Sequence, residues 1–110
     1  MNFLGILQQI LNQAQQAKPM RTSFYRTKDG LADYRFSFEQ VSDGPWRAYI
    51  LDQPDYRGRA DDCHSTHRLT DGGRRYVCWD RLLRTEREAR DVAALWADKT
   101  QRYIRFGESF

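Results

Sequence analysis

The stretch Thr85–Gly107 (TEREARDVAALWADKTQRYIRFG) decides the fold of this chain. It opens with a Thr-x-x-Glu pattern, in which the Thr85 hydroxyl and the Glu88 carboxylate can satisfy reciprocal backbone N–H groups at a helix start. Small and apolar residues then recur at helical spacing, namely Ala89, Val92, Ala93, Trp96, Thr100, Tyr103 and Ile104. The sequence therefore predicts a helix over residues 85–105 that ends at Gly107 and packs one face against the rest of the protein.

Upstream of this helix, the spacing of the apolar residues changes to two. Tyr34, Phe36 and Phe38 alternate with polar residues, which is typical of a strand that is buried on one face. Turn residues separate the further expected strands, which are placed at residues 22–28, 46–51, 64–69 and 74–80. Residues 21–80 thus predict an antiparallel sheet of about four to five strands. The whole chain is then expected to adopt an α+β fold, with the long helix on one sheet face.

Residues 1–18 predict a second, amphipathic helix. Leu4, Leu7 and Leu11 lie at helical spacing, the polar positions between them are mostly Gln and Asn, and Pro19 stops the pattern. We expect this helix to pack on the sheet or to pair with a second copy, which would make the protein a homodimer. Its uncharged polar face argues against binding to a membrane surface.

Length and composition narrow the class of protein. A chain of 110 residues fits one domain. Its composition, with 40% hydrophobic and 30% charged residues, excludes both a disordered and a membrane-embedded protein. The sequence contains neither a secretory signal pattern nor a run of about 18 apolar residues. Its two cysteines are too few for a disulfide scaffold. We therefore expect a single-domain, cytoplasmic protein with no membrane contact.

The basic residues point to a binding function. The chain carries 18 basic and 15 acidic residues, and most of the basic ones are arginine, which suits planar contacts at interfaces or with phosphates. Arg35 and Arg47 lie opposite Phe36 and Trp46 on their strands, so arginine is also expected on the open side of the sheet. The predicted partner-binding residues lie on the expected exposed loop 53–62, the second hairpin and the helix start: Tyr56, Arg57, Arg59, Arg74, Arg75, Arg84 and Arg87.

The stretch Asp61–Leu69 (DDCHSTHRL) raises the alternative of a metal or thiol site. On a strand, His64 and His67 would point to opposite faces and could not share a metal ion. Cys63, His67 and Cys78 remain a possible zinc set or thiol centre, but their spacing lacks the paired ligand patterns of such sites. We therefore expect neither catalytic residues nor a metal or cofactor, and a zinc or thiol enzyme is the second alternative.

Three segments resemble the arm-binding domains of tyrosine integrases and a class of plant DNA-binding domains. They are Trp46–Ile50, Arg75–Trp79 and the Thr85–Ala89 helix start. Those modules place three antiparallel strands before a helix and read DNA from the sheet. The resemblance implies a nucleic-acid-binding accessory protein of a mobile element. The main expectation is a small, non-enzymatic module that binds another protein and has a regulatory role.

Overall fold

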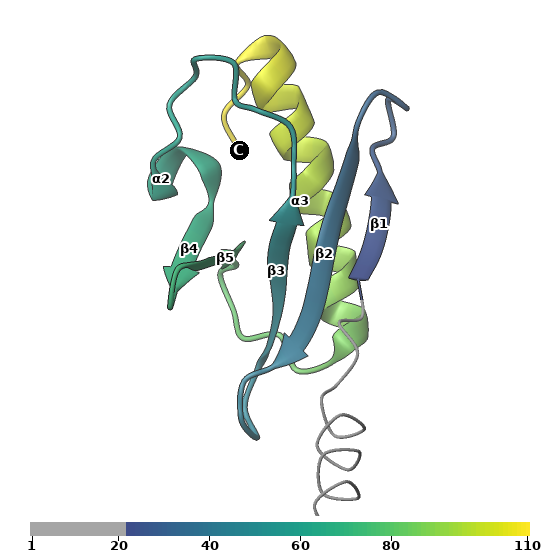
Figure 1. Cartoon of the computed structure of the whole chain (residues 1–110), viewed down its shortest axis with the longest axis vertical. Helices are drawn as coiled ribbons and strands as arrows, with labels where there is room; N and C mark the ends of the chain where they lie inside the picture. Colours follow the sequence, from purple (N-terminus) through teal and green to yellow (C-terminus); the bar gives the residue numbers. More distant parts are fainter. Residues whose placement is uncertain (1–21) are drawn as a thin grey trace, which may run out of the picture.

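The computed structural model describes residues 22–110, which form an antiparallel sheet and one long helix (Figure 1). The elements follow the order β1 (Thr22–Arg26), β2 (Asp33–Gln40), β3 (Trp46–Asp52), α2 (Cys63–Thr66), β4 (Arg68–Asp71), β5 (Arg74–Val77) and α3 (Glu86–Phe106). The five strands are arranged in the order β1-β2-β3-β5-β4. The predicted α+β class, strand number and C-terminal helix are confirmed, whereas residues 1–18 and the expected N-terminal helix lie outside the described residues.

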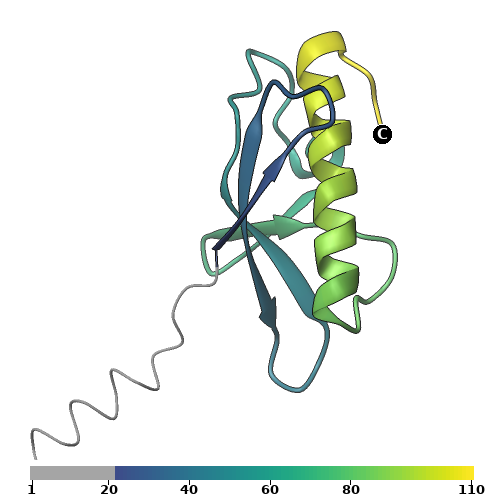
Figure 2. The same cartoon turned by 90° about the vertical axis from the view of Figure 1, so that its right-hand side faces the viewer.

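The helix α3 covers one face of the sheet along its length (Figure 2). Trp96 lies at the centre of this layer and is almost fully buried, with its ring edge-on to Tyr34 and Phe36 of β2 at 5.8 and 6.0 Å. The predicted alternation of β2 is therefore correct, because Tyr34, Phe36 and Phe38 all belong to the core. β1 is joined to the helix by the Tyr25 hydroxyl, which donates a hydrogen bond to Asp98 at 2.6 Å.

Both ends of α3 are capped at the predicted residues, although Glu88 accepts from Arg84 rather than from Thr85. The Thr85 hydroxyl accepts a hydrogen bond from the Glu88 backbone N–H at 3.1 Å. The Glu88 carboxylate accepts from the backbone N–H of Arg84 at 2.8 Å, one residue before the cap. At the other end Gly107 adopts a left-handed conformation with φ of 74°, which a residue without Cβ takes at no steric cost.

The expected strand over residues 64–69 is wrong in its first half. Residues 63–66 instead form the single helical turn α2, because the Asp62 carboxylate accepts from the Ser65 backbone N–H and caps the turn. His67 then adopts a left-handed conformation with φ of 52°, which ends the turn and starts β4 at Arg68. The capping carboxylate thus outweighs the strand propensity of Ser65 and Thr66.

The expected exposure of the 53–62 loop is wrong for Tyr56, which is only 7% exposed. Its ring packs edge-on against Tyr103 of α3 at 6.0 Å, and the Arg68 guanidinium lies 4.8 Å from its centre. Arg68 is itself buried and donates hydrogen bonds to the Thr66 hydroxyl, the Gln53 side chain and the Asp61 carbonyl. Tyr56 and Arg68 therefore anchor this loop to the domain, whereas residues 57–62 are exposed as expected.

Within residues 22–110, neither helix has the length and apolarity that crossing a bilayer requires.

Candidate functional site

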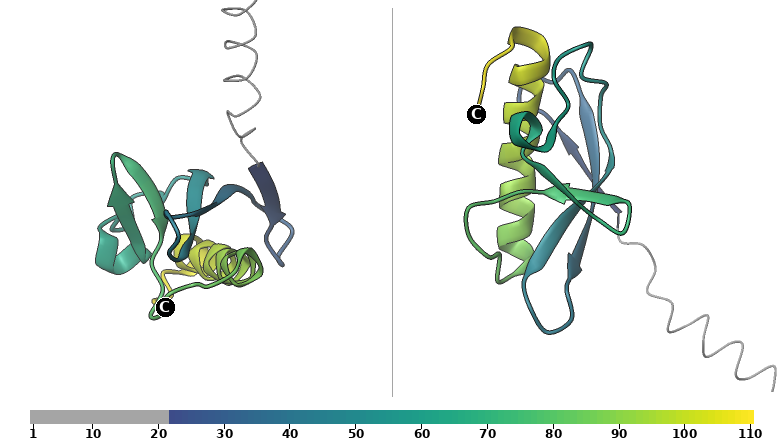
Figure 3. Two further views of the ribbon diagram at one scale, coloured as in Figure 1. Left: turned by 90° about the horizontal axis from the view of Figure 1, so that it is seen from below. Right: turned by 90° about the vertical axis from the view of Figure 1, so that its left-hand side faces the viewer.

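One face of the sheet carries no helix of the described chain. In Figure 3 the strands arch over α3 and leave their opposite face uncovered. Because side chains alternate along a strand, the residues between the core positions of β2 point to this face. We call this uncovered side of the sheet the open face. The strand register places on it, among others, Phe24, Arg35, Ser37, Glu39, Arg47, Tyr49, Leu69, Asp71, Arg74 and Tyr76.

Four of these residues interlock and form what we call the Tyr–Arg cluster: Arg47, Tyr49, Arg74 and Tyr76. The two tyrosine rings lie 5.8 Å apart, and each ring is covered by the arginine of the other strand. The Arg74 guanidinium lies 3.9 Å from the centre of the Tyr49 ring, and the Arg47 guanidinium lies 4.1 Å from that of Tyr76. Such cation–π contacts hold all four side chains in one arrangement.

Each of the two arginines is also held by a carboxylate, Arg47 by that of Asp71 and Arg74 by that of Glu39. Arg47 donates to Asp71 at 2.7 Å and to the Tyr49 hydroxyl at 3.2 Å. Arg74 forms a two-contact ion pair with Glu39, which also accepts a hydrogen bond from Ser37. The hydrogen bond to Asp71 raises the pKa of Arg47, and that to Glu39 raises the pKa of Arg74. Both guanidinium groups are therefore charged and pre-ordered.

The cluster spans the weakest join of the sheet. β3 and β5 are paired at one position, Tyr49 opposite Tyr76, whereas β2 and β3 are paired at six. We call this join the β3–β5 seam. All cluster contacts except the hydrogen bond between Arg47 and Tyr49 cross it. The four side chains thus contribute to stability. Arg47, Arg74 and Tyr76 also form part of the surface, whereas Tyr49 lies beneath Arg74 and is only 7% exposed.

Two apolar side chains lie at opposite edges of the open face. Phe24 on β1 is 72% exposed, and Leu69 on β4 is 39% exposed. Exposing a large aromatic side chain on a strand gains nothing for folding, so Phe24 is suited to contact with another molecule.

The structure distributes the seven predicted binding residues over several places. Arg74 belongs to the Tyr–Arg cluster, while Arg75 points away from the open face. Tyr56 is buried, and Arg59 donates to the Ile104 carbonyl at the end of α3. Arg57 is exposed on the loop between them.

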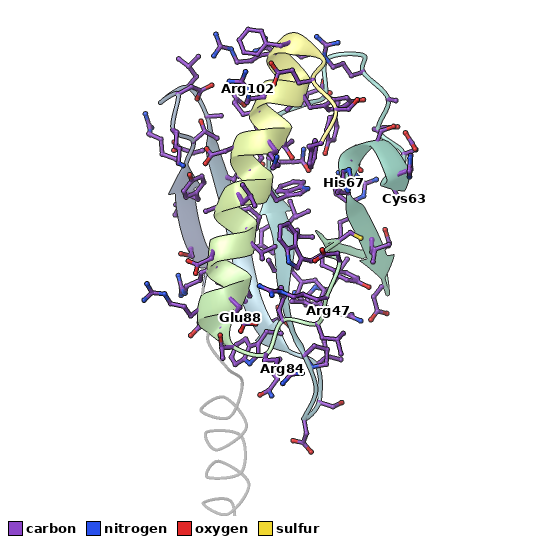
Figure 4. All side chains as sticks on the ribbon, turned by 180° about the vertical axis from the view of Figure 1, so that it is seen from behind. Arg47, Cys63, His67, Arg84, Glu88 and Arg102 are labelled. Atoms are coloured by element: carbon purple, nitrogen blue, oxygen red, sulfur yellow. The ribbon has the colours of Figure 1, made fainter. Side chains whose placement is uncertain are left out.

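The other two predicted residues lie at the opposite end of the helix, as Figure 4 shows for Arg84. Arg84 lines a second pocket of about 350 Å³ together with Arg81, Leu82 and Glu88. Arg87 is highly exposed, with Asp91 at 4.0 Å. The seven residues therefore do not form one surface.

Tyr49 and Tyr76 are the main residues that the sequence analysis missed. The alternation that placed Arg47 on the open side of the sheet also places Tyr49 there, so the sequence did contain a signal for Tyr49. The position of Tyr76 beside it depends on β5 lying between β3 and β4. No local pattern in the sequence encodes that strand order.

The cysteines and histidines converge only in part. Cys78 and His67 line the same pocket, and the Cys78 backbone N–H donates to the His67 carbonyl at 2.8 Å. Cys63 is exposed at the start of α2, on the outer side of that turn in Figure 4. In the part of the chain that the structure describes, no three His, Cys, Asp or Glu side chains are grouped closely enough to hold a metal ion. The zinc alternative therefore has no ligand set there.

Comparison with known protein families, with curated proteins and with solved structures gives no match. The resemblance to DNA-binding modules gains no support from these comparisons.

Proposed function

We propose that this chain is a small, non-enzymatic protein-binding module and that its partner contacts the open face. The Tyr–Arg cluster carries this proposal. Tyr and Arg dominate the residues that contribute most to protein–protein binding. Because contacts within the cluster and with Glu39 and Asp71 already order these side chains, little further side-chain entropy is lost when a partner binds.

The same contacts favour a protein over a nucleic acid. Binding to single strands uses free aromatic faces on which bases stack, but guanidinium groups cover Tyr49 and Tyr76. Binding to phosphates uses unpaired cations, but carboxylates already hold Arg47 and Arg74. The nucleic-acid-binding accessory function of a mobile element is therefore the alternative that the experiment below has to exclude.

Phe24 gives the sharpest test of this proposal, because its substitution leaves the cluster intact. Phe24→Thr keeps a residue suited to a strand and removes the exposed ring. Leu82→Thr is the matched control, since Leu82 is 70% exposed but lies on the segment before α3. Tagged wild-type protein and both variants are used to capture partners from a lysate of the source cells, with and without nuclease. The affinity of the purified partner is then measured for each protein.

We expect a protein partner that nuclease treatment does not remove. Phe24→Thr should weaken its binding at least tenfold, which corresponds to about 1.4 kcal/mol, whereas Leu82→Thr should bind like the wild type. Equal affinity of the two variants would place the contact surface elsewhere. A partner that is lost on nuclease treatment, with affinity falling steeply as salt rises, would support the nucleic-acid alternative instead.

A further inference from the structure

A pocket of about 320 Å³ lies on the side of the sheet that faces α3, away from the open face. Three aromatic side chains line it: Trp79, which follows β5, Trp96 of α3 and Phe110 near the end of the chain. His67 and Cys78 complete its walls. The volume falls in the range of small-molecule sites, and an apolar, aromatic lining is typical of them.

The walls of this pocket are held in place by contacts behind them. The Trp96 indole N–H donates to the Thr66 carbonyl at 2.9 Å, which fixes the plane of that ring. The Phe110 ring lies 4.5 Å from the His67 ring and packs edge-on against Tyr103. The cavity is thus pre-formed, so that filling it requires little rearrangement.

Two residues of opposite charge also line the pocket. Lys99 of α3 and Asp80, which follows Trp79, are both exposed to solvent. The ion pairs between described side chains involve neither of them, although α3 contains several such pairs. Among the described residues, the pocket therefore offers one cation and one anion that form no ion pair, beside an aromatic interior.

We propose that this pocket binds a free amino acid with an aromatic or large apolar side chain. The side chain occupies the aromatic interior, the carboxylate pairs with Lys99, and the ammonium group pairs with Asp80. A zwitterion matches both charges, whereas a ligand with one charge leaves the other uncompensated. This site lies apart from the proposed protein contact and would give the module a small-molecule ligand of its own.

Three related probes separate the two charges from the apolar contact. L-Phenylalanine carries both charges, 3-phenylpropionate carries only the carboxylate, and 2-phenylethylamine carries only the ammonium group. Ligand-observed NMR on the full chain measures their dissociation constants. Because both charged residues are exposed, each matched charge should strengthen binding about fivefold, so phenylalanine should bind more tightly than either analogue by about that factor.

Substitutions assign each charge to its residue. Lys99→Gln should reduce the affinity for phenylalanine to that for phenylethylamine, and Asp80→Asn should reduce it to that for phenylpropionate. Lys28→Gln is the control, because it removes the same charge from an exposed turn at the start of the described chain. It should leave all three dissociation constants unchanged. These exposed substitutions are expected to leave folding intact.

A fourth variant tests the cavity itself. Cys78→Phe fills it with a ring and should abolish binding of all three probes, with circular dichroism as the check on folding. Equal affinity for the three probes would contradict the proposal, as would binding too weak to saturate at the solubility limit. If Cys78→Phe does not fold, the pattern across Lys99→Gln and Asp80→Asn decides the question alone.

Discussion

At the scale of single residues, two neighbours on the 53–62 loop have opposite environments. Tyr56 is buried between Tyr103 and the Arg68 guanidinium, whereas Arg57 is exposed with a left-handed φ of 55°. The composition of the loop predicted exposure for both. The burial of Tyr56 could not be read from that composition, because its partners lie 12 and 47 residues further along the chain.

We expect Tyr56→Ala to lower the free energy of unfolding by about 3 kcal/mol, since it removes a buried aromatic ring. Arg57→Ala should change it by about 0.5 kcal/mol or less, because the side chain is exposed. Urea denaturation of both variants measures the difference. Similar values for the two substitutions would mean that the Tyr56 ring is not part of the core.

The contacts of the Asp29 carboxylate lead us to expect that the folded protein loses stability in acid. The carboxylate accepts hydrogen bonds from the Thr27 hydroxyl and from the Leu31 backbone N–H. These contacts, the first more than the second, lower its pKa from 3.8 to about 2. The contribution of Asp29 is therefore complete above its unfolded pKa and is lost as the pH falls from about 4 to about 2. Asp29→Asn should flatten this part of the stability curve, because asparagine has no carboxyl group to titrate. Denaturation midpoints between pH 5 and pH 2 test this expectation.

At the scale of elements, α3 was predictable because its signals are local. The capping residues, the apolar spacing and the terminal glycine all lie within Thr85–Gly107. The division of residues 63–71 into α2 and β4 was missed, because the side chain of Asp62 decides it through one hydrogen bond. A pattern of propensities does not reveal which carboxylate will cap a turn.

We expect Thr85→Ala to destabilise the protein by about 1 kcal/mol, because the Glu88 backbone N–H then loses its acceptor. Thr85→Ser keeps that acceptor and should restore most of the loss. Thermal unfolding followed by circular dichroism compares the two variants. If alanine and serine are equally stable, the cap does not contribute to stability.

At the scale of the whole molecule, the layered arrangement of sheet and helix followed from the sequence, but the candidate site did not. The alternation of apolar residues in β2 and their helical spacing in α3 identify the two surfaces that must meet. The Tyr–Arg cluster instead requires that β3 pair with β5, although β4 comes between them in the sequence. Such strand order depends on long-range contacts that a reading of local patterns cannot supply.

The β3–β5 seam also leads us to expect that parts of the sheet open at different rates. The β4–β5 hairpin is joined to β3 by one paired backbone position and by the cluster, and it is anchored to the domain by the buried side chains of Val77 and Arg68. Because β2 and β3 are paired at six positions, we expect the hairpin to open more readily than β1–β3. We expect backbone amides of Arg74–Val77 to exchange with deuterium faster than those of Phe36–Phe38. Arg47→Ala should accelerate exchange in the hairpin alone, and an equal acceleration in β2 would show that the sheet opens as one unit. Because Cys78 follows the hairpin directly and is only partly exposed, the same opening should make its thiol more accessible. In a Cys63→Ser background, which removes the exposed thiol, Arg47→Ala should therefore raise the rate at which a thiol reagent labels Cys78.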